Sequence, residues 1–245
     1  MLELAGLPAD CAKRRATGGC DVCQARPFSV CASVPDADLA RLDGLAETVA
    51  LEPDQALFRQ DDPVTHIFNV TSGSLRLSRL LPDGRRQIAG FLFAGDFIGL
   101  SDEARHAFAA EALEPSTLCR FRQGDYRALM REVRDLETAL LQRAGRELSA
   151  ARDQALRLGR KSALERLASF LIDLPGIDPL RPATPDVIRL PMTRGEIADY
   201  LGLTIETVSR SLTKLKQLGL VRQLSLNLLK VERHDALRDL AEGLG

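Results

Sequence analysis

The sequence predicts an α+β fold in which a β domain is followed by a long helix and a C-terminal winged helix-turn-helix. Three observations predict this order. Short apolar runs such as HIFNV and QIAGFLF alternate with Gly-containing turn signals between about Leu51 and Arg122, as in an antiparallel sandwich or barrel. The chain then lacks proline from about Asp125 to Leu158 and repeats apolar residues every three or four positions. Finally, TRGEIADYLGLTIETVSRSL has the spacing of two helices joined by a tight turn.

Composition bounds the class of protein. The 245 residues are 45% hydrophobic and 27% charged, which indicates one large or two modest globular domains and excludes disorder and fibrous structure. The formal net charge of −1 gives no field that would attract the whole protein to DNA, so any nucleic-acid surface must be local. No apolar run is long enough for a membrane helix, and the start lacks the order of a secretory signal. We therefore expect a cytoplasmic protein with no membrane partner.

The chain divides into four expected parts. Residues 1–33 form a cysteine-rich leader without periodicity, which needs something else to order it. Residues 34–123 form the β domain and open with a short helix that places Leu39, Leu42 and Leu45 at helical spacing. Residues 124–159 form the long helix. Residues 160–245 form the C-terminal domain, whose VRQLSLNLLKVER segment predicts a wing hairpin.

The long helix carries one apolar stripe. A helix of this length would span roughly 50 Å, more than one small domain can cover, so the stripe is expected to pack against a second copy. Burial against the chain's own β domain is the alternative. The residues expected at the dimer interface are Leu136, Leu140, Leu148, Ala151 and Ala155.

The helix-turn-helix prediction rests on three positional demands. Thr193 and Glu196 have the spacing of a capping box that starts the first helix. Gly202 can adopt the left-handed conformation of the turn, and small Ala198 with Val208 can fill the angle between the helices. All three demands are met together, which makes double-stranded DNA the expected partner.

The second helix, from about Thr204 to Gln217, would leave one polar face for the major groove. Arg210 can donate two hydrogen bonds to guanine, and Glu206 can accept one from cytosine. The predicted DNA-binding residues are Glu206, Ser209, Arg210, Thr213, Lys214 and Lys216, with the lysines suited to phosphates. The alternative is that Glu206 and Arg210, four residues apart, form only an exposed ion pair.

Four of the five cysteines lie in the leader, which in a reducing compartment indicates metal or redox chemistry rather than disulfides. Cys20 and Cys23 form a C-x2-C pair, Cys31 follows, and Cys119 ends a predicted strand. A tight pair with two outlying thiols can close around a metal centre, and by spacing alone structural zinc fits at least as well as iron-sulfur. Cys11 lies outside this set and is expected to be a free thiol. The alternative is that Cys11 takes the place of Cys20 as a metal ligand.

Taken together, the chain resembles the cyclic AMP receptor and fumarate-nitrate-reductase regulator (CRP/FNR) superfamily, whose sensor is a cyclic-nucleotide-binding-like β-roll. FLFAGDFIGL and MTRGEIADYLGLTIETVSRSL carry the resemblance most specifically. The Glu-x-x-Ser-Arg arrangement resembles the FNR branch, which implies a homodimer on a palindromic TTGAT-like operator. The resemblance further implies a 4Fe-4S cluster held by Cys20, Cys23, Cys31 and Cys119, with the alphaproteobacterial-type spacing, and regulation of transcription by oxygen under anaerobic conditions.

The resemblance also sets limits. Members that bind cyclic AMP hold its phosphate with an Arg-Ser pair, where this chain has His106-Ala107, so we expect no cyclic nucleotide. In the enteric type the dimer stripe carries an acidic residue where this chain has Ala151, so the dimer is expected to depend less on oxygen. The loop Asp83–Arg86 resembles a loop that contacts RNA polymerase, although a solvated turn fits it as well.

Two other functions are alternatives to an oxygen-responsive regulator. The sequence has no G-x-G-x-x-G after a strand, no P-loop, no H-E-x-x-H and no serine elbow, so an enzyme is not expected. The alternative is a regulator of the same fold whose cysteines bind structural zinc or act as a thiol redox switch.

Overall fold

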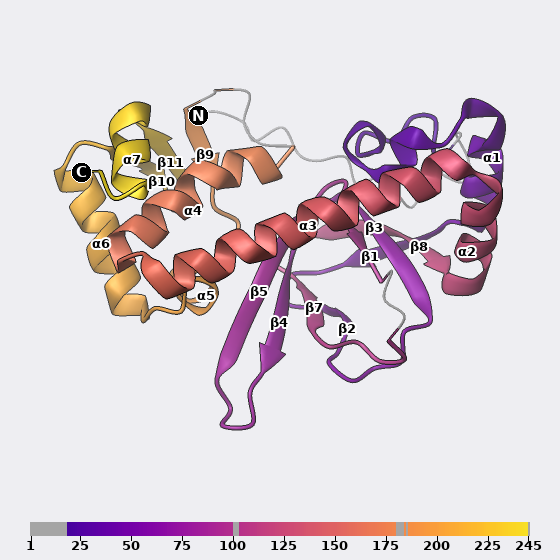
Figure 1. Ribbon diagram of the computed structural model, residues 1–245, viewed down its shortest axis with the longest axis horizontal. Coiled ribbons are helices and arrows are strands. Elements are labelled where there is room, and N and C mark those ends of the chain that lie inside the picture. Colours follow the sequence, from indigo (N-terminus) through magenta and orange to yellow (C-terminus); the bar gives the residue numbers. More distant parts are fainter. Residues whose placement is uncertain (1–18, 100–102, 180–183, 185, 245) are drawn as a thin grey trace. The chain divides into compact units, whose positions relative to one another are not determined.

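The computed structural model describes residues 19–99, 103–179, 184 and 186–244, and Figure 1 gives their helices and strands. The chain divides into two compact units. One contains the chain up to Leu77 together with Phe91–Arg143, and the other contains Ser78–Gly90 with Ala144–Gly245. The expectation for Cys11 lies outside the described residues. The four-part division of the sequence by function stays a prediction.

The leader is turn-rich from Gly19 onward and contains two short 3-10 helices, η2 (Arg26–Phe28) and η3 (Val30–Ser33). Helix α1 (Asp36–Leu45) follows, as the sequence predicted, and buries Leu39 and Leu42. Val30 and Cys31 are buried in the same apolar cluster as these leucines. The described part of the leader is therefore anchored to the β domain by its own apolar residues.

Eight strands form the two sheets of the β-roll. One sheet has the order β1-β8-β3-β6 and the other β2-β7-β4-β5. In the first sheet all neighbouring strands are antiparallel. Strand β3 has the sequence HIFNVTS, and its five central residues are all buried. The bounds are β1 (Glu47–Leu51), β2 (Ala56–Phe58), β3 (His66–Ser72), β4 (Ser74–Leu80), β5 (Arg86–Phe93), β6 (Phe97–Ile98), β7 (Ala109–Ala112) and β8 (Ser116–Arg122).

The predicted single helix is in fact two, which corrects the sequence expectation. Helix α2 (Gln123–Glu132) is followed by Val133, whose backbone leaves the helical region. Helix α3 (Arg134–Arg160) begins at the next residue. Val133 is itself buried, with Tyr126 and Leu129 of α2 and Leu136 of α3 in one cluster. The break therefore lets both helices bury their apolar residues in the same core.

The second unit holds the winged helix-turn-helix. Helix α4 (Ala163–Ile177) starts at a capping box made by Ser162 and Glu165 and contains Pro175 in its last turn. A three-stranded sheet of order β10-β11-β9 forms the wing, confirming the predicted hairpin (Figure 1). The remaining bounds are β9 (Val187–Arg189), α5 (Arg194–Leu201), α6 (Ile205–Gln217), β10 (Val221–Ser225), β11 (Leu228–Val231) and α7 (His234–Ala241).

None of the helices in the described ranges combines the length and the hydropathy that crossing a bilayer requires.

Candidate metal centre and nucleic-acid interface

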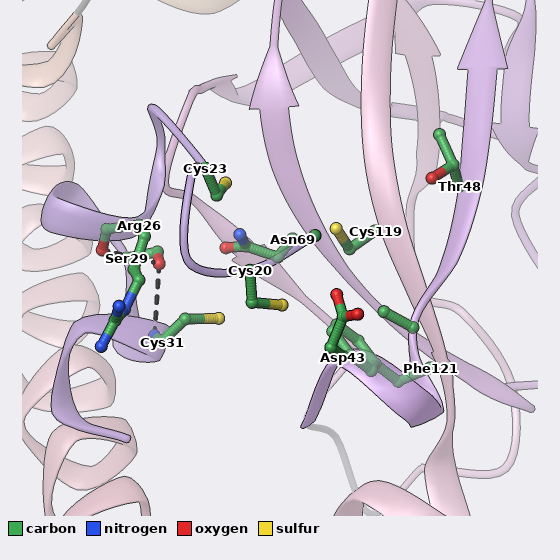
Figure 2. Close-up of a pocket in the computed structure, with 12 residues that line it drawn as sticks. Cys20, Cys23, Arg26, Ser29, Cys31, Asp43, Thr48, Asn69, Cys119 and Phe121 are labelled. Carbon is green, nitrogen blue, oxygen red and sulfur yellow. Dashed lines mark hydrogen bonds between the residues drawn. The ribbon is translucent and has the colours of Figure 1, made fainter. Parts of the chain in front are cut away.

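The four cysteines singled out from the sequence line one hollow in the first unit. Cys20, Cys23 and Cys31 come from the leader and Cys119 from β8, around a hollow of about 40 Å³. Figure 2 shows the Cys20 and Cys31 side chains pointing toward the strand that carries Cys119, whose Sγ points back toward the leader. The structure thus brings Cys119 beside thiols that lie 88 to 99 residues before it in the chain, as expected for ligands of one centre.

The sheet register places polar neighbours on either side of Cys119. In the antiparallel ladder Cys119 is opposite Thr48 of β1 and Asn69 of β3, and directly opposite residues share a face of the sheet. Both side chains line the hollow (Figure 2). Sequence reasoning missed Thr48 and Asn69, although a buried Asn within the apolar run IFNV is a signal that could have drawn attention.

Burial keeps two of these thiols, those of Cys20 and Cys31, in their neutral form. Burial raises the pKa of Cys20, with further increases from a hydrogen bond to the Asp43 carboxylate and from the neighbouring Cys119 and Cys31. Burial also raises the pKa of Cys31 to about 11, although its hydrogen bond with Ser29 acts in the opposite direction. A metal must displace these protons to bind, because thiolates rather than thiols are metal ligands.

Asp43 of α1 fixes the start of the described leader. Its carboxylate accepts a hydrogen bond from the Cys20 thiol. The same carboxylate lies so close to Gly19 that a Cβ on this glycine would be 1.8 Å from Asp43 Oδ1. Glycine before Cys20 therefore allows the close approach that brings this thiol onto α1.

The donor set fits a thiolate-bound metal group. Four thiols from two segments are the kind of soft donor that iron-sulfur clusters and zinc accept. A buried polar atom at the hollow, Asn69 Oδ1, has no hydrogen-bond partner among the residues that the structure describes. Within those residues, no three His, Cys, Asp or Glu side chains are close enough to hold a single ion, so a one-metal site would require the thiols to draw together.

The second site is the helix-turn-helix, whose three positional demands are all met. The Thr193 hydroxyl accepts a hydrogen bond from the Glu196 backbone N–H at 3.2 Å, and Glu196 Oε2 accepts one from the Thr193 N–H at 2.6 Å. Gly202 ends α5 in the left-handed region with φ of 61°. Val208 is fully buried between the helices, and Ala198 is 1% exposed. The predicted capping box, turn and plug are confirmed.

Helix α6 presents the predicted polar face. Thr204 caps the helix, while Val208, Leu212 and Leu215 are buried. Ser209 is partly exposed, and the other five predicted DNA-binding residues are exposed: Glu206, Arg210, Thr213, Lys214 and Lys216. Hydrogen bonds from its own backbone N–H and from the Thr204 side chain lower the pKa of Glu206, and the charge of Arg210 contributes less. The contact of this polar face with bases stays a prediction.

Two basic residues change the expected interface. Arg194, at the start of α5, places its guanidinium 3.5 Å from Ser209 Oγ and so joins the face of α6. Sequence reasoning missed it, although a basic residue directly after the capping Thr193 was a usable signal. Arg222 of β10, a basic residue of the wing, pairs with Glu232 at 2.6 Å, which partly neutralises its charge.

Replacing Arg210 and Lys214 separates base reading from phosphate binding. Arg210→Ala should weaken binding to a matching operator by about 10- to 100-fold, because one bidentate guanine contact contributes about 1–3 kcal/mol. Lys214→Ala should weaken binding to all sequences alike and reduce the salt slope by about one. Fluorescence anisotropy with matched and scrambled duplexes at several salt concentrations measures both; equal losses on both duplexes for Arg210→Ala would refute its base-reading role.

Arg166 of α4 joins three chain segments in the second unit. Its guanidinium donates to the carbonyl oxygens of Leu158, in the last turn of α3, at 2.8 Å and of Lys161, the residue after α3, at 2.9 Å. It also donates to Leu201 O, at the end of α5, at 3.0 Å. Cations are favourable at helix C-termini, where carbonyls lack partners within the helix. Arg166 therefore links the end of the long helix to the helix-turn-helix.

Loss of this arginine should destabilise the second unit. Arg166→Ala leaves three carbonyls without their charged donor, which should lower the free energy of unfolding by about 2–4 kcal/mol and Tm by roughly 5–10 °C. The matched control is Arg160→Ala, an exposed arginine in the same region. Thermal unfolding followed by circular dichroism compares the two. Equal small shifts would show that the carbonyls gain nothing from Arg166.

The expected dimer residues fall into two groups. Leu136 and Leu140 are 0% and 7% exposed and belong to the core of their own β domain. This differs from the expectation that they face a second copy, and the reason is that the first turns of α3 cover the sheet beside α1 and α2. Leu148, Ala151 and Ala155 are exposed, and the exposed fraction of Leu148 is 53%. Leu141 and Leu156 on the same helix are exposed as well. Their place at an interface stays a prediction.

The loop from Asp83 to Arg86 forms the turn between β4 and β5. Asp83 and Arg85 pair with each other at 2.7 Å and are exposed. Arg86 Nε donates to Asp199 Oδ2 of α5 at 2.9 Å within the second unit, so it is engaged inside the chain. Asp83 and Arg85 are the charged residues of this loop whose ion pair lies within the exposed turn itself.

The fold and the two sites define a class: a DNA-binding regulator with a β-roll sensor and a winged helix-turn-helix. Comparison with known proteins agrees. Residues 48–133 match the cyclic nucleotide-binding domain and residues 165–240 the Crp-like helix-turn-helix domain. The chain belongs to the CRP/FNR family of transcription regulators.

Two relatives and one solved structure indicate the branch. The nitrogen fixation regulation protein FixK of Bradyrhizobium diazoefficiens is 40% identical over 220 residues, 89% of this chain and 93% of the relative. The fumarate and nitrate reduction regulatory protein of Escherichia coli is 30% identical over 236 residues, 94% of each chain. The structure of FixK2 from Bradyrhizobium japonicum matches with a TM-score of 0.72 and 34% identity, over 80% of this chain and 96% of that one. These relatives are regulators of transcription rather than enzymes.

Proposed function

We propose that this protein is an oxygen-responsive transcription regulator that binds a palindromic TTGAT-like operator as a homodimer when a 4Fe-4S cluster is bound by Cys20, Cys23, Cys31 and Cys119. The observation that carries the proposal is the convergence of these four thiols, three from the leader and one from β8, on one hollow. Resemblance to the FNR branch favours iron-sulfur over zinc. The likeness to a fumarate and nitrate reduction regulator supports the same branch.

When bound, the cluster supplies an oxygen-labile bridge between the leader and the sheet. The chain's own residues give this bridge a route to α3. Cys31 shares a core with Tyr126 of α2 and with Leu136 and Leu140 of α3. Tightening the leader around Cys31 would therefore stabilise the packing that fixes the beginning of α3. Such a bias on a packed element is the usual way in which a local ligand shifts a population of conformations.

The exposed part of α3 supports the homodimer. Leu141, Leu148 and Leu156 are spaced by seven and eight residues, about two helical turns each, and lie on one face of the helix. Leucines exposed in a row on one helix favour a protein interface over solvent. Two recognition helices related by a twofold axis would meet half-sites about one DNA turn, roughly 34 Å, apart.

The remaining partners are proposed from the same surfaces. RNA polymerase would contact the exposed Asp83 and Arg85 of the β4–β5 turn. A cyclic nucleotide is not proposed, because the place of the phosphate-binding arginine is taken by His106, which stacks on Phe58 with ring centroids 3.6 Å apart. Burial lowers the pKa of His106 and so favours its neutral form, which is a poor partner for a phosphate.

The test is operator binding before and after exposure to air. Protein reconstituted anaerobically with iron and sulfide should bind a palindromic duplex about 100-fold more tightly than the same sample after air exposure, within the usual range of allosteric coupling. A duplex with one half-site scrambled serves as the control for dimer binding. Equal affinity before and after air, with iron demonstrably lost, would separate DNA binding from the metal centre and refute the proposal.

A further inference from the structure

Asn69 is the buried polar residue of the cysteine hollow whose function the proposal above leaves unexplained. The residue is 2% exposed, in the middle of β3. Its Oδ1 has no hydrogen-bond partner among the described residues. A carboxamide that is removed from water without compensating hydrogen bonds destabilises the folded chain, so such groups usually mark a ligand or water that belongs at the site.

The direction of the side chain indicates where this partner belongs. Asn69 lies opposite Cys119 in the ladder between β3 and β8. Figure 2 shows its carboxamide extending from the strand into the space between the leader cysteines and Cys119. Two other polar residues of the wall are engaged elsewhere: Ser29 accepts a hydrogen bond from the Cys31 N–H at 3.2 Å, and Arg26 donates to Asp36 at 3.1 Å. Asn69 is therefore placed to contact a group held by the thiols.

We propose that the Asn69 carboxamide donates an N–H hydrogen bond to a sulfur atom of the metal centre and is a positioning residue for it. This inference rests on the proposed function. The N and O atoms of the group exchange by a half-turn, so the side chain that leaves Oδ1 without a partner in the metal-free protein can turn its N–H donors toward sulfur in the loaded protein. Hydrogen bonds to sulfur stabilise iron-sulfur centres, and outer partners of metal ligands typically change metal retention by 10- to 100-fold.

The role predicts opposite effects in the two states of the protein. Asn69→Leu has the same number of side-chain atoms but no polar group, so it should raise Tm of the metal-free protein by several degrees. In protein reconstituted anaerobically with ferrous iron and sulfide, the same change should shorten the half-life of the absorption near 400 nm against a chelator by about 10-fold. A residue that serves only packing would change both in the same direction.

Two further variants sharpen the test. Thr71→Val removes another buried polar residue of β3, whose hydroxyl donates to Thr117 O at 2.9 Å, and should lower Tm with no change in iron retention. Asn69→Thr keeps a donor on a β-branched side chain and should restore part of the retention, which also covers the case that Asn69→Leu fails to fold.

The outcomes are distinguishable. Faster iron loss in Asn69→Leu with partial rescue in Asn69→Thr supports the inference. Wild-type retention in both Asn69 variants overturns it and leaves the proposed function intact. Failure of the wild-type protein to take up iron removes the centre itself and overturns both.

Discussion

Replacing Cys119 by serine is expected to abolish iron uptake and to lower operator affinity by about 100-fold. Cys119 is the one cysteine of the sequence outside the leader, so it alone can connect a group bound by the leader to the sheet. Serine keeps the size of the side chain but offers a hard oxygen in place of the soft thiolate that iron-sulfur groups require. Iron analysis of anaerobically reconstituted protein and anisotropy with operator DNA measure the two losses.

Cys11→Ser is the matched control, since the sequence places Cys11 outside the ligand set. It should keep the iron and the operator affinity of the wild type. If Cys11→Ser lost the iron while Cys20→Ser retained it, Cys11 would replace Cys20 as the ligand. If Cys119→Ser retained a full complement of iron, the bridge between leader and sheet would be ruled out.

Replacing Leu148 by glutamate is expected to weaken the dimer by at least about 100-fold. Each copy would lose the burial of a leucine, about 2 kcal/mol, and the twofold axis would bring two carboxylates near each other. Sedimentation equilibrium measures the dimer constant, and binding to the palindromic duplex should fall in parallel. Leu80→Glu, at a leucine that is 61% exposed in β4, controls for the loss of a surface leucine. A fully dimeric Leu148→Glu protein would place the interface elsewhere.

Local signals in the sequence were sufficient for the helix-turn-helix. The Thr193 cap, the Gly202 turn and the buried Val208 each depend on interactions within a few residues, so the pattern alone identified them. The convergence of Cys119 with the leader cysteines was predicted by resemblance to a family, and the structure places them together. Spacing alone had left zinc and iron-sulfur open.

Other features depend on tertiary packing that no local pattern encodes. The break at Val133 exists because α2 and α3 share a core with α1, and the same core takes Leu136 and Leu140 away from the predicted dimer stripe. Periodicity identifies an apolar face but does not identify its partner. The contacts of Arg166 with Leu201 join residues 35 positions apart, beyond the reach of any local rule.

The central claim is tested most directly by the iron and acid-labile sulfide content of protein purified without oxygen, read together with its visible spectrum. We predict about four iron and four sulfide per chain and a broad absorption near 400 nm that fades in air. A colourless protein with one zinc per chain, or one whose cysteines only form disulfides, would contradict the account and leave a DNA-binding regulator with a different signal.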